Sequence, residues 1–186
     1  MPYNPSKAAQ TIAYFALQQG HAINVLKVTK LVYLADRESV KRRGHPIQDE
    51  ARVSMPFGPV NSVTLGWING SYRDETGEWS GILKDRSNHR VGVTNPELTI
   101  NDLDELSDSE LQILEDVWAK FGQMDRFALA DWTHDTNNVP EWQDPNGSAT
   151  PISLERLMAA VGLDRPIERA REIEGVNSAS NILSSL

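Results

Sequence analysis

Residues 24–44 read NVLKVTKLVYLADRESVKRRG, and this stretch specifies a long helix from its start to its end. Asn24 can cap the first turn, and Gly44 follows a basic run that complements the negative end of the helix dipole. The apolar side chains between them form one wide stripe: Val28, Leu31, Val32, Tyr33, Leu34 and Ala35. A stripe this broad predicts a central helix with neighbours on more than one side.

Apolar residues at helical spacing predict further helices before and after this one. Capping residues, prolines and glycines mark their ends. They run from Asn4 to Gly20, from Pro59 to Gly70, from Ser107 to Gly122, from Asp125 through Thr133, from Pro151 through Val161, and from Asp164 to about Gly175. The tail after Gly175 is weakly specified, which is typical of a mobile end.

One short piece of β-structure is expected in the middle of the chain. Residues 78–84 and 89–94 favour a β-hairpin around residues 85–88, although Gly81 and Gly92 weaken both strands. No internal repeat and no linker divides the chain. We therefore predict a mostly α fold, a single helical domain with a small inserted β-hairpin, which is α+β with few strands.

Length, cysteine count and charge restrict the class of protein. The chain has 186 residues, which suits one domain with a sizeable core. It contains no cysteine, which excludes a disulfide framework, thiolate metal sites and cysteine nucleophiles. The formal net charge of −8 disfavours nucleic acid as a partner, because an acidic protein repels phosphate backbones. An acidic surface suits a basic protein partner, and it also simply keeps a small domain soluble.

The N-terminal segment lacks a basic region followed by a long apolar run, so we expect no signal peptide. No uninterrupted apolar segment is long enough to span a bilayer, so no membrane partner is expected. With the absence of cysteine, these features favour a cytoplasmic location.

Residues 131–144, DWTHDTNNVPEWQD, concentrate chemically capable side chains. On a helix, Asp131, His134 and Asp135 share a face, and an Asp–His pair can orient a general base. The sequence offers no nucleophile to go with them, since it has neither a G-x-S-x-G elbow nor a cysteine. FGPV at 57–60 has too few glycines for a phosphate loop. We therefore expect no catalytic residues and no enzyme activity.

The metal interpretation of this stretch is also weak. The four histidines, His21, His45, His89 and His134, are scattered, and there is no H-E-x-x-H motif. We expect no metal and no cofactor. In the structural alternative Trp132 packs with Phe127 and Leu129, His134 sits at a helix end, Pro140 forces a turn, and Trp142 closes on the body as an apolar plug.

Three separate stretches together resemble a known family. They are KLVYLAD at 30–36, FGPV at 57–60, and the TH at 133–134 followed by PEW at 140–142. In this order they resemble the Panacea domain, an antitoxin domain of bacterial and phage toxin–antitoxin systems, over residues 5–145. The resemblance implies a Panacea-like antitoxin domain at 1–150, with 151–186 as a C-terminal helical extension packed on the same domain.

The resemblance implies an antitoxin that neutralises a cognate protein toxin by direct protein–protein binding, and it brings no catalytic residues. Two alternatives remain: a proteolytic adaptor or chaperone-like binding module, and a small metal-dependent hydrolase built on His134, Asp131 and Asp135. The family motif maps to positions expected to be mainly structural: Lys30, Leu31, Tyr33, Leu34, Ala35, Asp36, Gly58, Pro59, Val60, Thr133, His134, Pro140 and Trp142.

Aromatic side chains in loops are the best candidates for contacts with a partner. Phe57, Tyr72 and Trp79 lie in or beside predicted loops or the hairpin, so we predict them as partner-binding residues. Ordinary packing under loops is the alternative for all three. Three other tryptophans lie on helical stripes and are assigned to the core: Trp67, Trp118 and Trp132.

Overall fold

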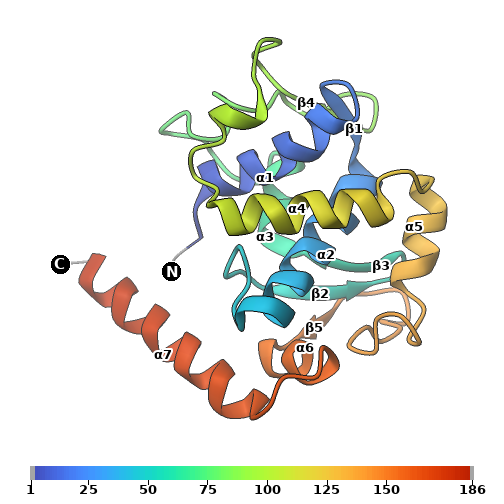
Figure 1. Ribbon diagram of the computed structural model, residues 1–186, viewed down its shortest axis with the longest axis vertical. Coiled ribbons are helices and arrows are strands. Elements are labelled where there is room, and N and C mark those ends of the chain that lie inside the picture. The colour runs from blue at the N-terminus through green and yellow to red at the C-terminus, as the bar shows by residue number, and fades with distance from the viewer. Residues whose placement is uncertain (1–2, 185–186) are drawn as a thin grey trace.

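Helix α2 (Val25–Arg43) runs through the middle of the molecule in the computed structural model, which describes residues 3–184, with side chains to residue 176 (Figure 1). Asn24 caps it by accepting a hydrogen bond from the backbone N–H of Leu26 at 3.0 Å. Its neighbours are helices α1 (Pro5–Gln18), α4 (Asp108–Phe121), α5 (Arg126–Thr133) and α6 (Leu154–Ala160). The prediction of a central helix with neighbours on several sides is confirmed.

Helices α1 and α4 pack with α2 into the first hydrophobic core. Asn4 caps α1 and Pro5 begins it, while Ser107 and Glu110 form a capping box at the start of α4, as predicted. Fully buried side chains from all three helices meet in this core, among them Ile12, Phe15, Leu31 and Leu114. Each such side chain stabilises the fold by roughly 1.5–3 kcal/mol through burial.

A three-stranded antiparallel sheet lies beside α2. Strand β2 (Arg52–Met55) is central, between β3 (Gly58–Asn61) and β5 (Thr150–Ile152). Val53 faces Val60 on one side and Pro151 on the other. The short helix α3 (Ser62–Ile68) follows β3 directly.

Two predicted helix starts are wrong because a proline there lies in a strand. Pro59 belongs to β3, and α3 begins only after Asn61. Pro151 belongs to β5, and α6 begins after Ser153, which accepts a hydrogen bond from the backbone N–H of Arg156. Proline fixes a φ that suits a first helical turn and an edge strand equally, and both β3 and β5 are edge strands.

The hairpin predicted at 78–94 is only partly formed. Its second half contains strand β4 (Arg90–Gly92), but β4 pairs with β1 (Ala22–Asn24) instead of with residues 78–84. The first half meets the second at an isolated bridge between Leu83 and Val93. Residues 79–83 form a turn, in which Trp79 O accepts from the backbone N–H groups of Ile82 and Leu83. The Trp79 side chain is buried in the core. The short 3-10 helix η1 (Ile100–Asp102) follows β4.

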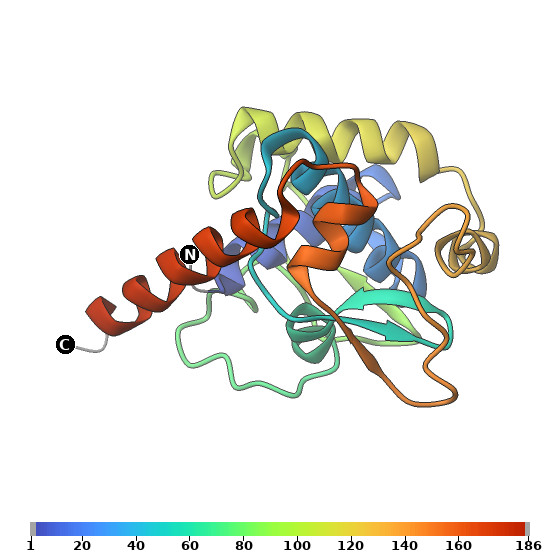
Figure 2. The same ribbon diagram turned by 90° about the horizontal axis from the view of Figure 1, so that it is seen from below.

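The C-terminal part adds a second, smaller core on the other side of α2. Its buried members include Tyr33, Val40, Trp142, Leu157 and Met158. Helix α7 (Pro166–Ser184) leaves this core and projects from the body (Figures 1 and 2). The predicted end at Gly175 is wrong. A glycine in an exposed helix costs only about 1 kcal/mol and has no end signal around it here. The last two residues of the predicted tail lie outside the described part of the chain.

Residues 3–184 contain seven α-helices and five short strands, so the mostly α fold with few strands is confirmed. Within the same range no helix has both the length and the apolar character that a membrane crossing requires.

Candidate functional site

Three polar side chains of α2 lie at successive turns of the helix and are buried. Lys30, Tyr33 and Asp36 are spaced by three residues, so they share one face, and each is at most 1% exposed. Buried polar groups are costly unless they form hydrogen bonds. Their partners therefore determine how α2 is joined to the rest of the molecule.

Asp36 accepts four hydrogen bonds. Its Oδ1 accepts from the backbone N–H groups of Ile47 and Gln48 at 3.0 and 3.1 Å. Its Oδ2 accepts from Asn61 Nδ2 at 2.7 Å and from Arg52 Nη2 at 3.1 Å. The Asp36 carboxylate thus joins α2 to the loop that follows it and to the β2–β3 hairpin.

Glu50 is a second buried carboxylate beside the first. Its two oxygens accept from Thr64 Oγ1 at 2.6 Å and from the backbone N–H of Thr64 at 2.8 Å. Its Oε1 also accepts from Asn61 Nδ2 at 3.1 Å. Burial raises the pKa of Glu50 to about 7. The amide of Asn61 therefore holds two carboxylates together.

Glu141, the acid of the PEW motif, is fully buried against α2. Its Oε1 accepts from the Tyr33 hydroxyl at 2.8 Å and from Arg37 Nε at 2.7 Å. Next to it, Trp142 Nε1 donates to the backbone carbonyl of Met55 at 3.0 Å. The PEW segment is thus fastened both to α2 and to the end of β2.

Gly58 and Thr133 touch where the hairpin meets the end of α5. Gly58 has a φ of +94°, and a Cβ atom built on it would lie 2.5 Å from Thr133 Oγ1. His134 follows Thr133, and its ring lies 5.5 Å from the Trp142 ring. Only glycine fits at position 58, because both the conformation and the close approach exclude a side chain.

These contacts place nearly all the motif positions in one buried framework. Leu31, Leu34 and Ala35 complete it from the apolar side of α2, and Val60 does so from β3. Pro140 alone among them is exposed, at the turn before Glu141. These contacts join α2 to the sheet and to the PEW segment, and two motif residues, Lys30 and Val60, also line a surface pocket.

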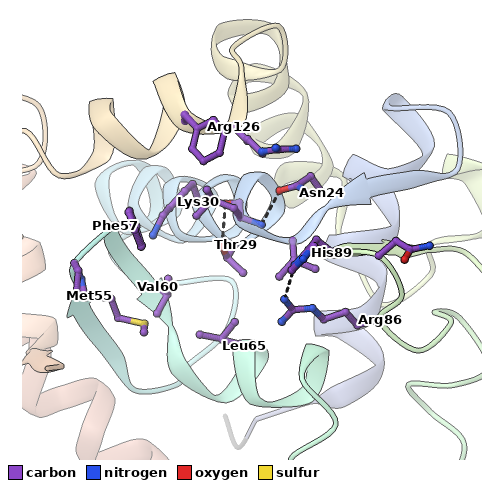
Figure 3. Close-up of a pocket in the computed structure, with 15 residues that line it drawn as sticks. Asn24, Thr29, Lys30, Met55, Phe57, Val60, Leu65, Arg86, His89 and Arg126 are labelled. Atoms are coloured by element: carbon purple, nitrogen blue, oxygen red, sulfur yellow. Dashed lines mark hydrogen bonds between the residues drawn. The ribbon is translucent and has the colours of Figure 1, made fainter. Parts of the chain in front are cut away.

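Of these two residues, Lys30 is the charged one. Its Nζ donates to the backbone carbonyl of Pro59 at 3.0 Å, and no acidic group is among its recorded contacts in the described chain. Burial lowers the pKa of Lys30 to about 7. Lys30 lies at the base of a pocket of about 570 Å³ (Figure 3).

The pocket is built where four separate segments meet. One wall is the start of α2, and the backbone N–H of Val25 donates to His89 O at 2.8 Å, which holds the 86–89 loop there. A second wall is the two-residue turn Pro56–Phe57 between β2 and β3. The third is the start of α5, where Asp125 accepts from the backbone N–H of Phe127 at 2.8 Å. The lining is mainly apolar: Val25, Leu26, Met55, Phe57, Val60, Leu65 and Phe127.

Two exposed phenylalanines belong to this pocket. Phe57 is 64% exposed and Phe127 is 56% exposed. Only five large apolar side chains are exposed in the described part of the chain, and these are two of them. Large apolar groups that share one hollow mark a binding surface more than scattered ones do.

The charged groups that line the pocket are all basic. They are Lys30, Arg86 and Arg126, with His89 beside Arg86, and no carboxylate is among the described lining residues. Arg86 donates to Asn69 Oδ1 and contacts His89 Nδ1, while Arg126 lies over the Phe127 ring, 4.7 Å from its centroid. A hollow with positive charge thus occurs in a chain whose net charge is −8.

A comparison with models of protein families matches residues 28–143 to the family described as antitoxin SocA-like, Panacea domain. The chain belongs to this family. Comparisons with curated proteins and with solved structures find no match. The family gives the chain an antitoxin-family role and suggests that this role is not enzymatic.

The Panacea match begins in the first turns of α2 and ends just after Trp142. It contains every residue of the buried framework described above. It also contains the pocket residues Phe57, Arg86 and Phe127, whereas the lining residues Val25 and Leu26 precede it. Helix α1 and the segment from β5 to α7 lie outside it.

The three residues predicted to bind a partner lie in three different environments. Phe57 lines the pocket and is exposed. Tyr72 is 46% exposed and packs on the Trp67 ring outside the pocket. Trp79 is only 6% exposed, stacked on Trp67 with ring centroids 5.4 Å apart. Trp79 thus has the position described by the alternative interpretation, ordinary packing under loops.

Sequence reasoning missed Phe127 and Arg126. Phe127 was assigned to the core with Leu129, but the residues of α5 that face the core are Leu129, Ala130 and Thr133. Phe127 lies in the first turn of α5 and is 56% exposed. It is three residues before the buried Ala130, so helical spacing alone could not have separated it from the core. Trp67, Trp118 and Trp132 are partly buried and pack against the core, as predicted.

The acidic stretch around His134 does not form a convergent site. His134 Nε2 lies 3.8 Å from Asp131 Oδ1, and the Asp131 side chain is 78% exposed. Asp135 instead accepts hydrogen bonds from Asn137. Among the described residues no three histidine, aspartate or glutamate side chains come close enough to hold a metal ion.

Proposed function

We propose that this Panacea-domain protein is an antitoxin that neutralises a cognate protein toxin by direct binding, with the pocket at Phe57 as part of the contact surface. The observation that carries the proposal is the pair of exposed phenylalanines, Phe57 and Phe127, at one apolar hollow within a domain of an antitoxin family. Aromatic anchors of this kind supply much of the affinity of protein interfaces.

The hydrogen bonds of the buried carboxylates support a binding function over an enzymatic one. Asp36, Glu50 and Glu141 each accept hydrogen bonds from groups of the fold itself. Their geometry accounts for them as links between α2, the sheet and the PEW segment. The accessible part of the same region is an apolar hollow, which suits a partner's side chains.

Co-expression with the protein encoded by the neighbouring gene tests the proposal. We expect rescue of growth and a complex that survives size-exclusion chromatography. Phe57→Ala should weaken the complex by about tenfold or more without lowering the melting temperature, since Phe57 is exposed. Ile167→Ala, also exposed but on α7, is the matched control and should change neither. If no complex forms and growth is not rescued, the proposal is refuted.

A further inference from the structure

We propose that the pocket binds an acidic segment of the toxin that inserts apolar side chains between Phe57 and Phe127. This inference rests on the proposed function and adds to it the chemistry of the partner. It starts from a contrast in charge. The chain as a whole carries −8, yet the pocket is lined by Lys30, Arg86 and Arg126 and by no carboxylate among its described residues.

The apolar part of the segment follows from the walls. Phe57 and Phe127 come from different elements, the β2–β3 turn and the start of α5, and both line the same hollow. Both rings remain more than half exposed, so each has apolar surface that a partner can cover. A volume of about 570 Å³ is within the range of sites that hold more than one side chain.

The acidic part follows from the cations. Within the described part of the chain the side-chain contacts of Arg86 are with neutral groups, Asn69 and His89, and Arg126 lies over a phenylalanine ring. The recorded acidic neighbour of Arg126 is Asp125, the cap of its own helix, which does not line the pocket. Carboxylates of an incoming segment would therefore meet positive groups on opposite sides of the mouth, as Figure 3 shows for Arg86 and Arg126.

Lys30 adds a cation at the base of the pocket. Its Nζ has one recorded hydrogen bond, to Pro59 O, and an ammonium group has three donors. A carboxylate placed near it would raise its pKa back toward the ordinary value, because an opposite charge favours the charged form. Binding of an acidic segment would thus take up a proton near pH 7.

Nucleic acid is the other polyanion that basic residues bind. The cations here line one apolar hollow, and the chain as a whole carries a net charge of −8. Proteins that bind nucleic acid need an extended positive path to follow the backbone. The geometry therefore favours an acidic protein segment.

Fluorescence anisotropy with three labelled peptides tests the inference on the full chain. In the first peptide a Phe-Leu pair is flanked on each side by two glutamates. The second has lysines in place of the glutamates, and the third has serines in place of Phe-Leu. We expect saturable binding of the first and at least about tenfold weaker binding of the other two. Equal binding of the lysine peptide, or no binding of the first, would overturn the inference.

Variants locate the binding. The double variant Arg86→Gln/Arg126→Gln should weaken the first peptide by about fivefold or more, and Phe127→Ala should weaken it by about tenfold. Arg73→Gln removes an exposed charge elsewhere and should have no effect. Peptide binding that all pocket variants leave unchanged would refute the assignment, as would tighter binding of a single-stranded RNA oligonucleotide to the same arginines.

The outcome is distinguishable from failure of the proposed function. If the Arg86→Gln/Arg126→Gln variant forms the toxin complex normally, the proposed antitoxin function stands and the proposal of an acidic segment is refuted. If the first peptide binds but no complex forms with the neighbouring gene product, the preference of the pocket for an acidic segment is retained and the antitoxin function is refuted.

Discussion

Asn61 Nδ2 on β3 lies 2.7 Å from Asp36 Oδ2 on α2, and this hydrogen bond joins the edge of the sheet to the central helix. The same amide reaches Glu50, and Arg52 pairs with the same Asp36 oxygen. The buried polar residues around Asp36 are therefore coupled. Loss of one leaves buried charge on the others without a partner.

Replacement of Asp36 by alanine should be strongly destabilising. Arg52 would remain buried without its carboxylate, and such losses cost about 3–5 kcal/mol. The free energy of unfolding in urea measures the effect. Asp85→Ala, at an exposed aspartate, is the control and should stay within about 0.5 kcal/mol of the parent. Similar stability of the two variants would show that the network is not coupled.

Gly58→Ala should destabilise the fold by roughly 2–5 kcal/mol, because it adds both backbone strain and a clash with Thr133. Gly147→Ala measures the backbone strain without the clash. Gly147 has a φ of +86° and nothing within 4 Å of an added Cβ, so only the strain of about 1–2 kcal/mol applies. Thermal unfolding compares them. Thr133→Ala should recover part of the loss in Gly58→Ala, and strictly additive effects would contradict the clash.

Stability should fall between about pH 4.5 and pH 7 because of Glu50. Burial raises the pKa of Glu50 from 4.5 to about 7, so in this window the folded chain binds more protons than the unfolded chain. The free energy of unfolding then decreases as the pH rises, by up to about 3 kcal/mol from this group. Urea titrations of the parent and Glu50→Gln at several pH values measure the slope, which should flatten in the variant. An unchanged slope would assign the dependence to other groups.

Trp79→Ala and Phe57→Ala should behave in opposite ways, although both aromatics follow loops in the sequence. Trp79 is buried against Trp67, so its loss should cost about 3–5 kcal/mol of stability. Phe57 is exposed, so its loss should leave the melting temperature nearly unchanged and weaken partner binding. Calorimetry of both variants tests the assignment. A Trp79→Ala protein as stable as the parent would contradict the burial of Trp79 in the core.

The elements with local signals could be predicted from the sequence. Helices α1, α2 and α4 carry caps at Asn4, Asn24 and Ser107, and the wide stripe of α2 correctly indicated its central position. Pro59 and Pro151 were assigned to helices because the same proline suits a helix start and an edge strand. Only pairing with β2 decides between them, and for Pro151 that strand is distant in the sequence.

The pocket was harder to predict because its walls come from four separate segments. Phe57 was identified from its position in a loop, while Phe127 was placed in the core by helical spacing although it is exposed. Arg86 reaches the pocket only because β4 pairs with β1, which is a contact between residues far apart in the sequence. A local sequence pattern does not predict a contact between segments that are far apart in the chain.

The separation between the buried framework and the rim of the pocket has a consequence for how such a protein changes over time. Phe57, Arg86 and Phe127 form none of the hydrogen bonds that hold α2 to the sheet and to the PEW segment. Substitutions there alter what the hollow accepts at little expense in stability, whereas Asp36, Asn61 or Gly58 tolerate almost none. Under the proposed function, one scaffold can in this way be adapted to a different toxin by changes at the rim of the pocket, without a new fold.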